Sequence, residues 1–488
     1  MQINKQISFI MIFAIIITTL FTSCAQSPKG ENARQTSDAV TSTGTEPAES
    51  ILLDRIPQND YNGYEFNYLA LSAGINATTR FVDEMWVEGE VGEVVNDAVY
   101  ARNIFLADTN NIIVTVTPSA DPPGAFAKAI TAGDNVYDLA GIYKWNAMNL
   151  ASQGYARNWN DLNIDYSQPW WSRGASEKLQ VLGSQFLMSG SILISEIDDT
   201  LAMIYNKGIA ENYNIADIYA DVRDMKWTID KFGEYVAQIA EDLDGDGKYN
   251  AGDDLLGYVQ DPASMTNNWV FSTGLLNGYI DEDGLYQMNV DVNRAQNVLD
   301  KLSPLFNSDS VANGIDLYEG LNYFEENKIF MYAIILRNLE LLREMDLDFG
   351  VIPYPMYDET QSKYITHVGS ASPILILPLL NTEDDQRLAD ILDAMSMASA
   401  HFVIPAYYET ALKVKISRDN ESAEMLDIIL DTKTYDITYL IGDGLVSTMA
   451  PLLTRKSIDF ASSFAKTEQR SLKTIQQTID KLVEATHN

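Results

Sequence analysis

Residues 226–243 read KWTIDKFGEYVAQIAEDL, and the spacing of their apolar side chains predicts an amphipathic helix. Thr228 stands directly before the first of these side chains and is the predicted N-cap. Side chains three or four positions apart share one face of a helix, so this stretch should bury one face against a core. The apolar positions are Ile229, Phe232, Val236, Ile239 and Leu243.

Short apolar runs on either side of this helix predict buried strands. They are residues 112–117 (IIVTVT), 349–353 (FGVIP) and 373–377 (PILIL), and polar or proline residues bound each run. A second helical repeat surrounds Leu388 and Ile391, behind the acidic residues 383–385, which suit a helix N-terminus. Strands that alternate with helices predict an α/β fold.

Composition excludes several classes of protein. The 488-residue chain has a formal net charge of −36, which excludes a nucleic-acid binder, because such binding requires clustered Lys and Arg. Hydrophobic residues make up 46% of the chain and charged residues 21%, so it is globular rather than disordered as a whole. At roughly 150 residues per domain, the length predicts two or three folding units.

The first 50 residues predict an export signal followed by a tether. Lys5 precedes the apolar residues 9–21, and Thr22, Ser23 and Cys24 follow, which predicts a signal peptide over 1–23. The segment resembles a bacterial lipobox, with Phe21 where leucine is usual, so Cys24 is the predicted lipid attachment site. Residues 24–50 lack large apolar side chains except for one valine and should form a flexible tether. The protein is therefore expected outside the cytoplasm, anchored to the cell membrane.

Residues 242–253 (DLDGDGKYNAGD) have the spacing of a calcium-binding loop. Oxygen-bearing side chains stand at loop positions 1, 3, 5, 9 and 12, glycine stands at position 6, and position 7 supplies its carbonyl oxygen. Position 12 holds Asp253 where the motif prefers Glu, so Asp254 is an alternative ligand; a solvated acidic turn is the alternative for the whole segment. We expect a structural calcium ion with the ligand residues Asp242, Asp244, Asp246, Lys248, Asn250 and Asp253.

Several segments together resemble the extracellular solute-binding proteins (family 1) of bacterial ABC importers, and most closely their sugar-type lipoprotein branch. In that branch a strand ends in Asn-Lys, Trp-Thr opens the next helix, and a calcium-like loop follows. The corresponding segments here are Tyr205-Asn206-Lys207, Lys226-Trp227-Thr228 and residues 242–253. Further segments that fit are residues 91–103, 169–171, 348–355, 361–364, 405–408, 418–419 and 425–427.

The resemblance implies a two-lobed α/β fold of the periplasmic-binding-protein type II class, with hinge strands between the lobes. Lobe one would comprise residues 51–198 and 370–400, and lobe two residues 199–369 and 401–488. It also implies a monomeric receptor that captures a solute, with an oligosaccharide as the expected class, and delivers it to ABC permease subunits. No catalysis and no organic cofactor are expected.

The predicted ligand residues follow the ends of apolar runs, since ligands of α/β sheets bind beyond the carboxyl ends of strands. Trp145 would stack on a sugar, and Trp269 would do so from the second lobe by resemblance. Packing inside the core is the alternative for both tryptophans, and for Trp170 and Trp171 it is the favoured interpretation. An exposed helical arginine is the alternative for Arg337. The full predicted set is Tyr143, Lys144, Trp145, Asn146, Trp269 and Arg337.

Two other functions remain open at this point. Histidine occurs only at positions 367, 401 and 487, and the chain contains no nucleophile-elbow, zinc-protease, P-loop or dinucleotide-binding motif. A glycoside hydrolase needs only two suitably separated carboxylates, so a secreted carbohydrate-active hydrolase is one alternative. A surface adhesin or sensor subunit with the same fold is the other.

Overall fold

The structure is a computed structural model. It describes residues 53, 55–73, 81–261, 264–283, 285–342, 345–369, 372–380, 384–408, 412, 419–442, 444–456 and 458–485. The predicted signal peptide, the tether and Cys24 lie outside these residues. The described residues belong to one compact unit, Pro47–Asn488. None of the described helices is both long and apolar enough to cross a membrane.

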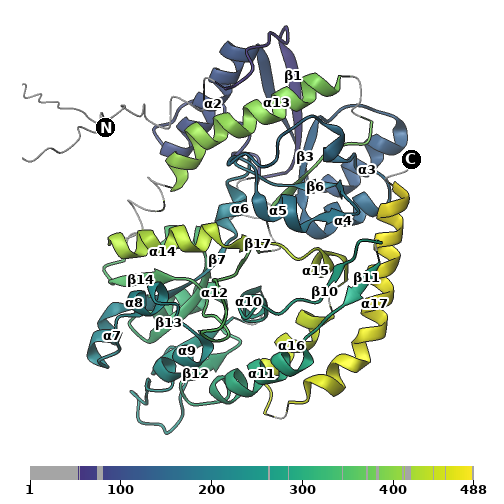
Figure 1. Cartoon of the computed structure of the whole chain (residues 1–488). Helices are drawn as coiled ribbons and strands as arrows, with labels where there is room; N and C mark the ends of the chain where they lie inside the picture. Colours follow the sequence, from purple (N-terminus) through teal and green to yellow (C-terminus); the bar gives the residue numbers. More distant parts are fainter. Residues whose placement is uncertain are drawn as a thin grey trace, which may run out of the picture. The chain divides into compact units, whose positions relative to one another are not determined.

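The first sheet has five strands in the order β2-β1-β3-β16-β6 (Figure 1). β1 (Tyr64–Leu71) pairs in parallel with β2 (Ile112–Ser119) and with β3 (Leu139–Tyr143). β16 (Pro373–Ile376) runs antiparallel to β3, and the short β6 (Leu187–Met188) runs antiparallel to β16. A strand from late in the chain therefore completes a sheet that the N-terminal part begins.

Helices connect and flank the strands of the first sheet. α2 (Val94–Asn110) leads into β2, and α3 (Pro122–Ala132) connects β2 to β3, so both form crossovers between parallel strands. α4 (Lys144–Ser152) follows β3 directly. The remaining helices of this part are η1 (Trp159–Asp161), α5 (Arg173–Lys178), α6 (Ser195–Asp198) and α13 (Asp385–Ala398).

The second sheet has the order β12-β9-β13-β7-β14, with β8 paired to β9. β9 (Leu255–Gln260) is parallel to β12 (Val311–Asn313) and to β13 (Ile329–Ile335). β7 (Leu201–Asn206) runs antiparallel to β13 and to β14 (Phe349–Ile352). Every residue of β7 and β13 is buried, so these strands form the centre of the core in this half.

Many helices surround the second sheet, and the C-terminal ones form a layer beside it (Figure 1). The last helix, α17 (Phe460–Ala485), packs against α11, α15, α16 and β11 of this half and also against α4 and β4 of the first half. The other helices of this half are α7 (Lys207–Asn212), α8 (Ile218–Arg223), α9 (Ile229–Val236), α10 (Ser264–Phe271), α11 (Val292–Phe306), α12 (Leu317–Glu325), η2 (Leu336–Leu342), α14 (Asn420–Asp431), α15 (Ile437–Gly442) and α16 (Leu445–Leu453). The short helix η3 (Ser399–Val403) continues α13 and packs against α2 and α13 of the first half.

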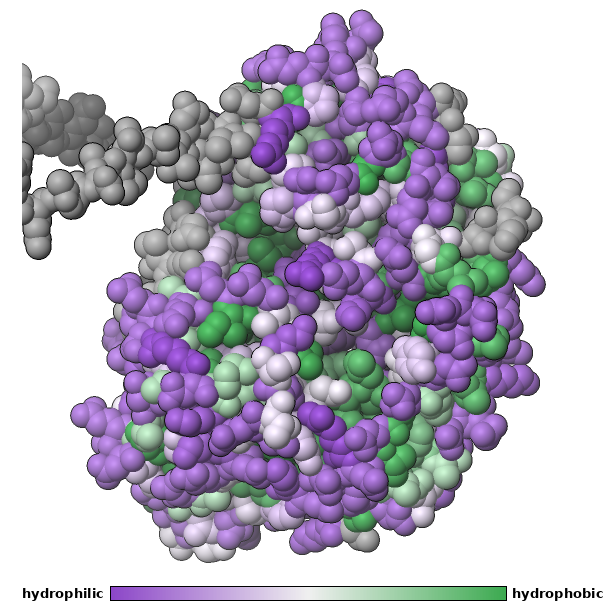
Figure 2. All heavy atoms as spheres, viewed as in Figure 1, coloured by the Kyte–Doolittle hydropathy of each residue, from purple (hydrophilic) through white to green (hydrophobic). Residues whose placement is uncertain are grey.

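Three short strand pairs complete the fold: β4 (Gln180–Val181) with β5 (Ser184–Gln185), β10 (Gly278–Ile280) with β11 (Tyr286–Met288), and β15 (Thr366–His367) with β17 (Lys433–Thr434). Hydrophilic residues cover most of the face shown in Figure 2, and hydrophobic residues appear on it in patches near mid-height.

The chain passes between the two halves in both directions. It leaves the first sheet after α6 and enters the second through β7, and it returns through β15 to β16. An antiparallel bridge between Thr200 and Val368 joins the outgoing and returning segments. The topology confirms the predicted α/β class with strands that cross between two halves. Every strand of the two large sheets falls inside its predicted lobe range, and the lobe boundaries themselves stay a prediction.

The three predicted strands are confirmed as β2, β14 and β16, and the second predicted helix as α13. Thr228 caps α9 as predicted, because its Oγ1 accepts a hydrogen bond from the N–H of Lys231 at 3.3 Å. The extension of this helix toward Leu243 is wrong, since α9 ends at Val236. Residues Ala240–Glu241 instead pair with β9 as β8, which leaves Leu243 exposed.

The close contact between β1 and β3 gives a test of the first sheet. A Cβ atom at Gly141 would lie 1.7 Å from the hydroxyl oxygen of Tyr68, a side chain with no exposed surface. We expect Gly141→Ala to lower the free energy of unfolding by about 1–3 kcal/mol, the usual range for overpacking a core. The control Gly89→Ala, with nothing within 4 Å of the added atom, should change it by less than about 0.5 kcal/mol in urea unfolding. Equal stability of the two variants would contradict this packing.

Candidate functional site

A pocket of about 490 Å³ lies between α4 and the strand ends of the second sheet. Gln260 ends β9 and Asn313 ends β12, and these two strands are parallel, so their carboxyl ends meet at one edge of the sheet. Trp145, on α4 just after the end of β3, forms the opposite wall. The pocket therefore has the position that α/β sheets use for ligands, with walls from both halves of the fold.

The C-terminal helices supply another wall of the pocket. Tyr439 on α15 lines it together with Val446, Ser447, Ala450 and Pro451 of α16. α10 contributes Thr266 and Asn267 to the same lining. Segments far apart in the sequence thus meet at this pocket.

Trp145 and Tyr439 form the aromatic part of the lining. Their ring centroids lie 5.0 Å apart, with the planes at 71° to each other, so the edge of one ring meets the face of the other. Trp145 keeps 38% of its surface exposed, whereas Tyr439 is held from behind by Phe271 and His367. One tryptophan face is therefore accessible on a supported aromatic pair.

Hydrogen bonds fix the amide side chains at the pocket. Asn267 Nδ2 donates to the Tyr439 hydroxyl at 3.0 Å, and Gln260 Nε2 donates to Thr266 Oγ1 at 2.8 Å. Among the described lining residues, Asp261 is the one acidic residue, and no lysine or arginine is present. Oriented amides, hydroxyls and one carboxylate beside an exposed aromatic ring suit a neutral, hydroxyl-bearing ligand.

Two of the predicted ligand residues flank Trp145 without lining the pocket. Tyr143 is partly buried, and its ring packs edge-on against Phe81 at a centroid distance of 5.3 Å. Asn146 is exposed on the first turn of α4, next to the pocket residue Trp145, but does not itself line the pocket.

The structure contradicts the predicted contact between Lys144 and a ligand. The side chain is only 2% exposed, and its ammonium group donates hydrogen bonds to the carbonyl oxygen of Gly369 and to Ser372 Oγ. Burial lowers the pKa of Lys144 to about 8, although the Asp199 and Glu196 carboxylates oppose this shift. Lys144 therefore belongs to the connection between the two halves and not to the pocket surface.

Trp269 is also corrected, because the structure places it in the core. It has no exposed surface, and its Nε1 donates to Gln260 Oε1 at 3.1 Å. Aromatic rings surround it at centroid distances from 4.7 to 5.9 Å. Its role is to hold Gln260 from behind the pocket. The surrounding rings are those of Phe232, Tyr258, Phe306 and Tyr354.

Arg337 lies away from the pocket and is not an exposed helical arginine either. Its side chain is 15% exposed, and Nη1 lies 3.7 Å from Asp199 Oδ1, beside the outgoing segment. The favoured packing of Trp170 and Trp171 is confirmed. Both are buried, and their indole N–H groups donate to Asp393 Oδ1 at 2.6 and 3.0 Å.

Solved structures share this arrangement at low sequence identity. The galacto-N-biose/lacto-N-biose I-binding protein of the ABC transporter from Bifidobacterium longum, in complex with lacto-N-biose, matches with a TM-score of 0.56 and 13% identity over 86% of this chain and 99% of that chain. The GacH receptor of Streptomyces glaucescens, solved with acarbose, matches with a TM-score of 0.53 and 13% identity over 84% of this chain and 99% of that chain. A family 1 extracellular solute-binding protein from Bifidobacterium longum subsp. infantis matches with a TM-score of 0.53 and 11% identity over 86% of this chain and 99% of that chain.

This chain has the two-lobed α/β fold of these structures. No protein-family model matches the sequence, and no curated protein matches it. At these identities the similarity establishes the fold and not the function.

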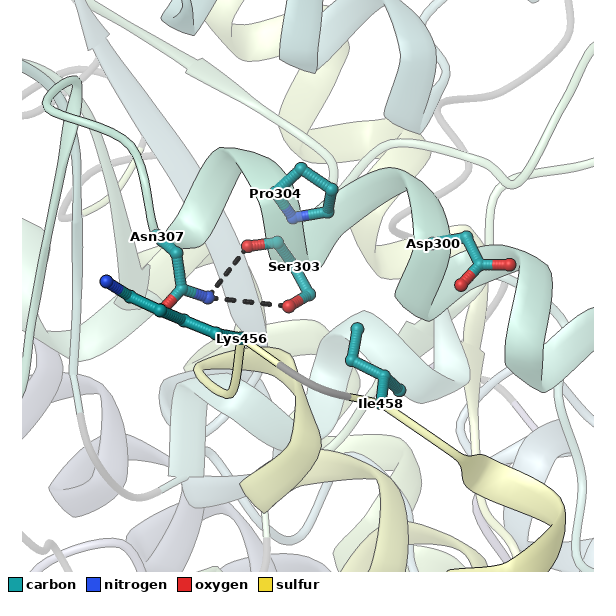
Figure 3. Close-up of a pocket in the computed structure, with 6 residues that line it drawn as sticks. All are labelled: Asp300, Ser303, Pro304, Asn307, Lys456 and Ile458. Carbon is teal, nitrogen blue, oxygen red and sulfur yellow. Dashed lines mark hydrogen bonds between the residues drawn. The ribbon is translucent and has the colours of Figure 1, made fainter.

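A second pocket, of about 410 Å³, lies on the surface of the second half (Figure 3). Asn307, the C-cap residue of α11, donates from Nδ2 to the backbone oxygen of Ser303 at 2.8 Å, and Lys456 and Ile458 border the pocket from the other side. Among the described residues that line it, none ends a strand and none is aromatic. We therefore place the candidate ligand site of this solute-binding fold at Trp145 and not here.

The acidic loop gathers three of its predicted metal ligands. Carboxylate oxygens of Asp242, Asp244 and Asp246 lie within 4.8 Å of one another, so the donor set fits a hard cation. The N–H of Gly247 donates to Asp242 at 2.9 Å and lowers the pKa of that carboxyl. The Lys248 ammonium lies 2.9 Å from Asp246 Oδ2, where it partly neutralises the cluster.

Asp254 closes this loop in a different way from the predicted Asp253. Asp253 is exposed, whereas Asp254 has no exposed surface and accepts hydrogen bonds from the N–H groups of Leu243 and Asn250 at 2.9 and 2.8 Å. The buried carboxylate of Asp254 thus joins the start and the end of the loop.

Sequence reasoning missed most of the pocket. Gln260 and Asn313 end strands that the sequence analysis did not identify, although an Asn-Gly pair after an apolar run is a usable signal. Tyr439 and the α16 residues carried no local signal, because only the packing of α15 and α16 beside α4 and α10 brings them to the pocket.

His367 supports Tyr439 and makes stability depend on pH. Its ring stacks on Phe271 at 4.1 Å, and burial lowers its pKa to about 3. Below the ordinary pKa of about 6.5 the unfolded chain binds a proton at this residue that the folded chain does not, so acidification destabilises the fold. We expect a loss of about 1.4 kcal/mol per pH unit from this group between about pH 6.5 and about pH 3.

His367→Gln should lose this part of the pH dependence, as measured by urea unfolding at about pH 7 and about pH 4.5. His401→Gln, in the η3 segment, is the control and should keep the slope of the unmodified protein. Equal pH slopes for the unmodified protein and His367→Gln would show that His367 does not contribute.

Proposed function

We propose that this protein is a receptor that captures an oligosaccharide in the pocket between its two halves and delivers it to ABC permease subunits in the membrane. The observation that carries the proposal is the exposed face of Trp145, which lies across the pocket from the carboxyl ends of β9 and β12. The two-lobed fold supports the proposal, because closure of two lobes around a ligand is an established way to capture it.

The lining favours a sugar over other solutes. A sugar ring presents C–H groups on a face and hydroxyls around its edge, and the pocket offers an aromatic face together with amides, hydroxyls and a carboxylate. Two of the matching structures are sugar complexes, with lacto-N-biose and with acarbose. If the ligand were a peptide, the protein would still be a receptor, but its ligand class would not be a sugar.

The lining also favours binding over hydrolysis. A glycoside hydrolase places a pair of carboxyl groups on either side of the scissile bond. Among the described residues of the pocket, Asp261 is the one acidic side chain. We therefore propose a binding protein that performs no chemistry, in preference to the carbohydrate-active hydrolase.

The proposal includes anchoring of a monomer at the outer surface of the cell membrane. The support is the sequence pattern that ends at Cys24, with residues 24–50 as the tether between the lipid and the folded part. An adhesin or sensor subunit would share this anchor, and transport of a bound glycan by a neighbouring permease distinguishes the receptor from both.

The test is a thermal-shift screen of the full chain, purified in detergent, against oligosaccharides, monosaccharides and peptides. A solute at a hundred times its dissociation constant should stabilise the folded state by about 2.7 kcal/mol. A shift with one glycan class and no cleavage of that glycan supports the proposal. A shift with peptides alone replaces the substrate class, and no shift with any solute rejects the receptor.

Trp145→Ala should weaken the binding of the glycan found in the screen by about tenfold or more, a change of at least about 1.4 kcal/mol, because it removes the exposed aromatic face. Trp86→Ala, at a tryptophan of similar exposure outside this pocket, should leave the affinity unchanged. Isothermal titration measures both. Similar losses in the two variants would move the site away from Trp145.

We also propose that calcium binds the acidic loop and stabilises it without switching a conformation. Asp242, Asp244 and Asp246 would supply carboxylates, Lys248 its carbonyl oxygen, and Asn250 and Asp253 the remaining side-chain oxygens, with Asp254 as the alternative to Asp253. Bound calcium would bring the ends of this surface loop together. The exposure of the loop and its position beside β9 support a local, structural role.

Removal of calcium by EGTA should lower the melting temperature of the full chain, and Asp244→Asn should abolish the difference between calcium and EGTA. The control is Asp283→Asn, in an acidic turn outside this loop, which should keep the difference in melting temperature between calcium and EGTA. Terbium luminescence excited through Tyr249, inside the loop, reports the same binding independently. A melting temperature that ignores EGTA in the unmodified protein would contradict the calcium proposal.

A further inference from the structure

We propose that Lys144 is a positioning residue that couples the ligand pocket to the connection between the two halves. Its ammonium group binds the returning segment at Gly369 and Ser372, while its backbone begins the helix turn that presents Trp145 to the pocket. This inference deepens the proposed function and rests on it where ligand binding is concerned.

The returning segment that Lys144 binds is tied to the outgoing segment at Asp199. The N–H of Gly369 donates to the backbone oxygen of Asp199 at 2.8 Å, and the N–H of Ser372 donates to Asp199 Oδ2, also at 2.8 Å. A Cβ atom at Gly369 would lie 2.5 Å from Asp199 Oδ2, so the two segments are in close contact. Lys144 reaches this junction from the first half.

Arg337 reaches the same junction from the second half. Its Nη1 lies 3.7 Å from Asp199 Oδ1, and the buried Asp199 therefore faces cations from both halves. The Lys433 ammonium lies 3.3 Å from Glu196 Oε1 on α6, which extends the charged network along the outgoing segment. A relative movement of the halves must alter the contacts of this junction.

A charged Lys144 is unfavourable at this buried position unless hydrogen bonds or opposite charges stabilise its ammonium group. Burial disfavours a charged ammonium, and a cation at the start of a helix is repelled by the helix dipole. Within the described part of the chain, no side-chain hydrogen bond caps the N-terminus of α4, where Tyr143 occupies the cap position. The hydrogen bonds of Lys144 to Gly369 and Ser372 therefore attach this first turn to the returning segment, while the ring contact with Tyr439 holds Trp145 on the pocket side.

A consequence follows for ligand binding. A sugar stacked on Trp145 would contact the first turn of α4, and Lys144 attaches that turn to the crossing segments. Ligand binding and the arrangement of the two halves would therefore both depend on this turn. Removal of the ammonium should release Trp145 even without ligand, and should weaken ligand binding only as long as Trp145 is present.

The experiment uses the full chain labelled with 5-fluorotryptophan, in detergent. The fluorine resonance of Trp145, one of seven tryptophans, is assigned as the line missing from Trp145→Phe. We expect Lys144→Met to shift or broaden this line without ligand. The control is Lys207→Met, because Lys207 also begins a helix directly after a strand and pairs with carboxylates, at Asp348 and Asp419 in the second half. It should leave the Trp145 line unchanged.

Titration with lacto-N-biose and acarbose gives the second measurement. We expect Lys144→Met to weaken binding by about tenfold or more, within the usual range of coupling between sites, and Lys207→Met to weaken it less than about twofold. In a Trp145→Ala background the additional loss from Lys144→Met should fall below about threefold, because the two changes act on one element. Ser372→Ala removes one acceptor of the Lys144 ammonium and should also weaken binding and shift the Trp145 line. This variant replaces Lys144→Met as the test if Lys144→Met does not fold.

An unchanged Trp145 line in Lys144→Met overturns the inference, as does a full loss of affinity that persists without Trp145. Failure of the unmodified protein to bind any solute rejects the proposed function instead. In that case the fluorine spectra still decide whether Lys144 positions Trp145.

Discussion

The pairing of two crossing segments is the constraint on which the rest of this fold depends. Each large sheet contains a strand delivered from the other half, β16 in the first and β7 in the second. The segments that deliver them meet at the bridge between Thr200 and Val368 and at the hydrogen bonds around Asp199. Both sheets are complete only if these segments stay together, so the space between the halves is defined by a small, buried and charged junction.

The pocket follows from that constraint. Its lining comes from both of the halves that the crossing segments join, with Trp145 on α4 from the first and the carboxyl ends of β9 and β12 from the second, and α15 and α16 add a further wall. The polar lining is fixed from behind by the aromatic core around Trp269 and by the ring stack of His367 and Phe271. A rigid lining of this kind spares a ligand the entropic cost of ordering its own binding site.

The sequence predicted the elements well where the signal was local. The strands β2, β14 and β16 and the cap at Thr228 follow from apolar runs and side-chain chemistry within a few residues. The length of α9 was wrong because β8 pairs with a strand that comes later in the chain, which no local pattern records. Trp145 was assigned from its place after an apolar run and Trp269 by resemblance, and only the tertiary packing of four other rings decides that Trp269 is core. Lys144 was assigned to the ligand for its place after a strand, whereas its direction is set by Gly369 and Ser372, more than 220 positions away.

The last helix limits how the space between the halves can widen. α17 has 26 residues and packs at one end beside α4 and β4 and along its length against α11, α15 and α16 (Figure 1). A helix of that length spans about 39 Å. If the two halves separated on the side where α17 lies, α17 would lose its contacts either with α4 and β4 of the first half or with α11, α15 and α16 of the second. The apolar side chains at those contacts would then be exposed to water.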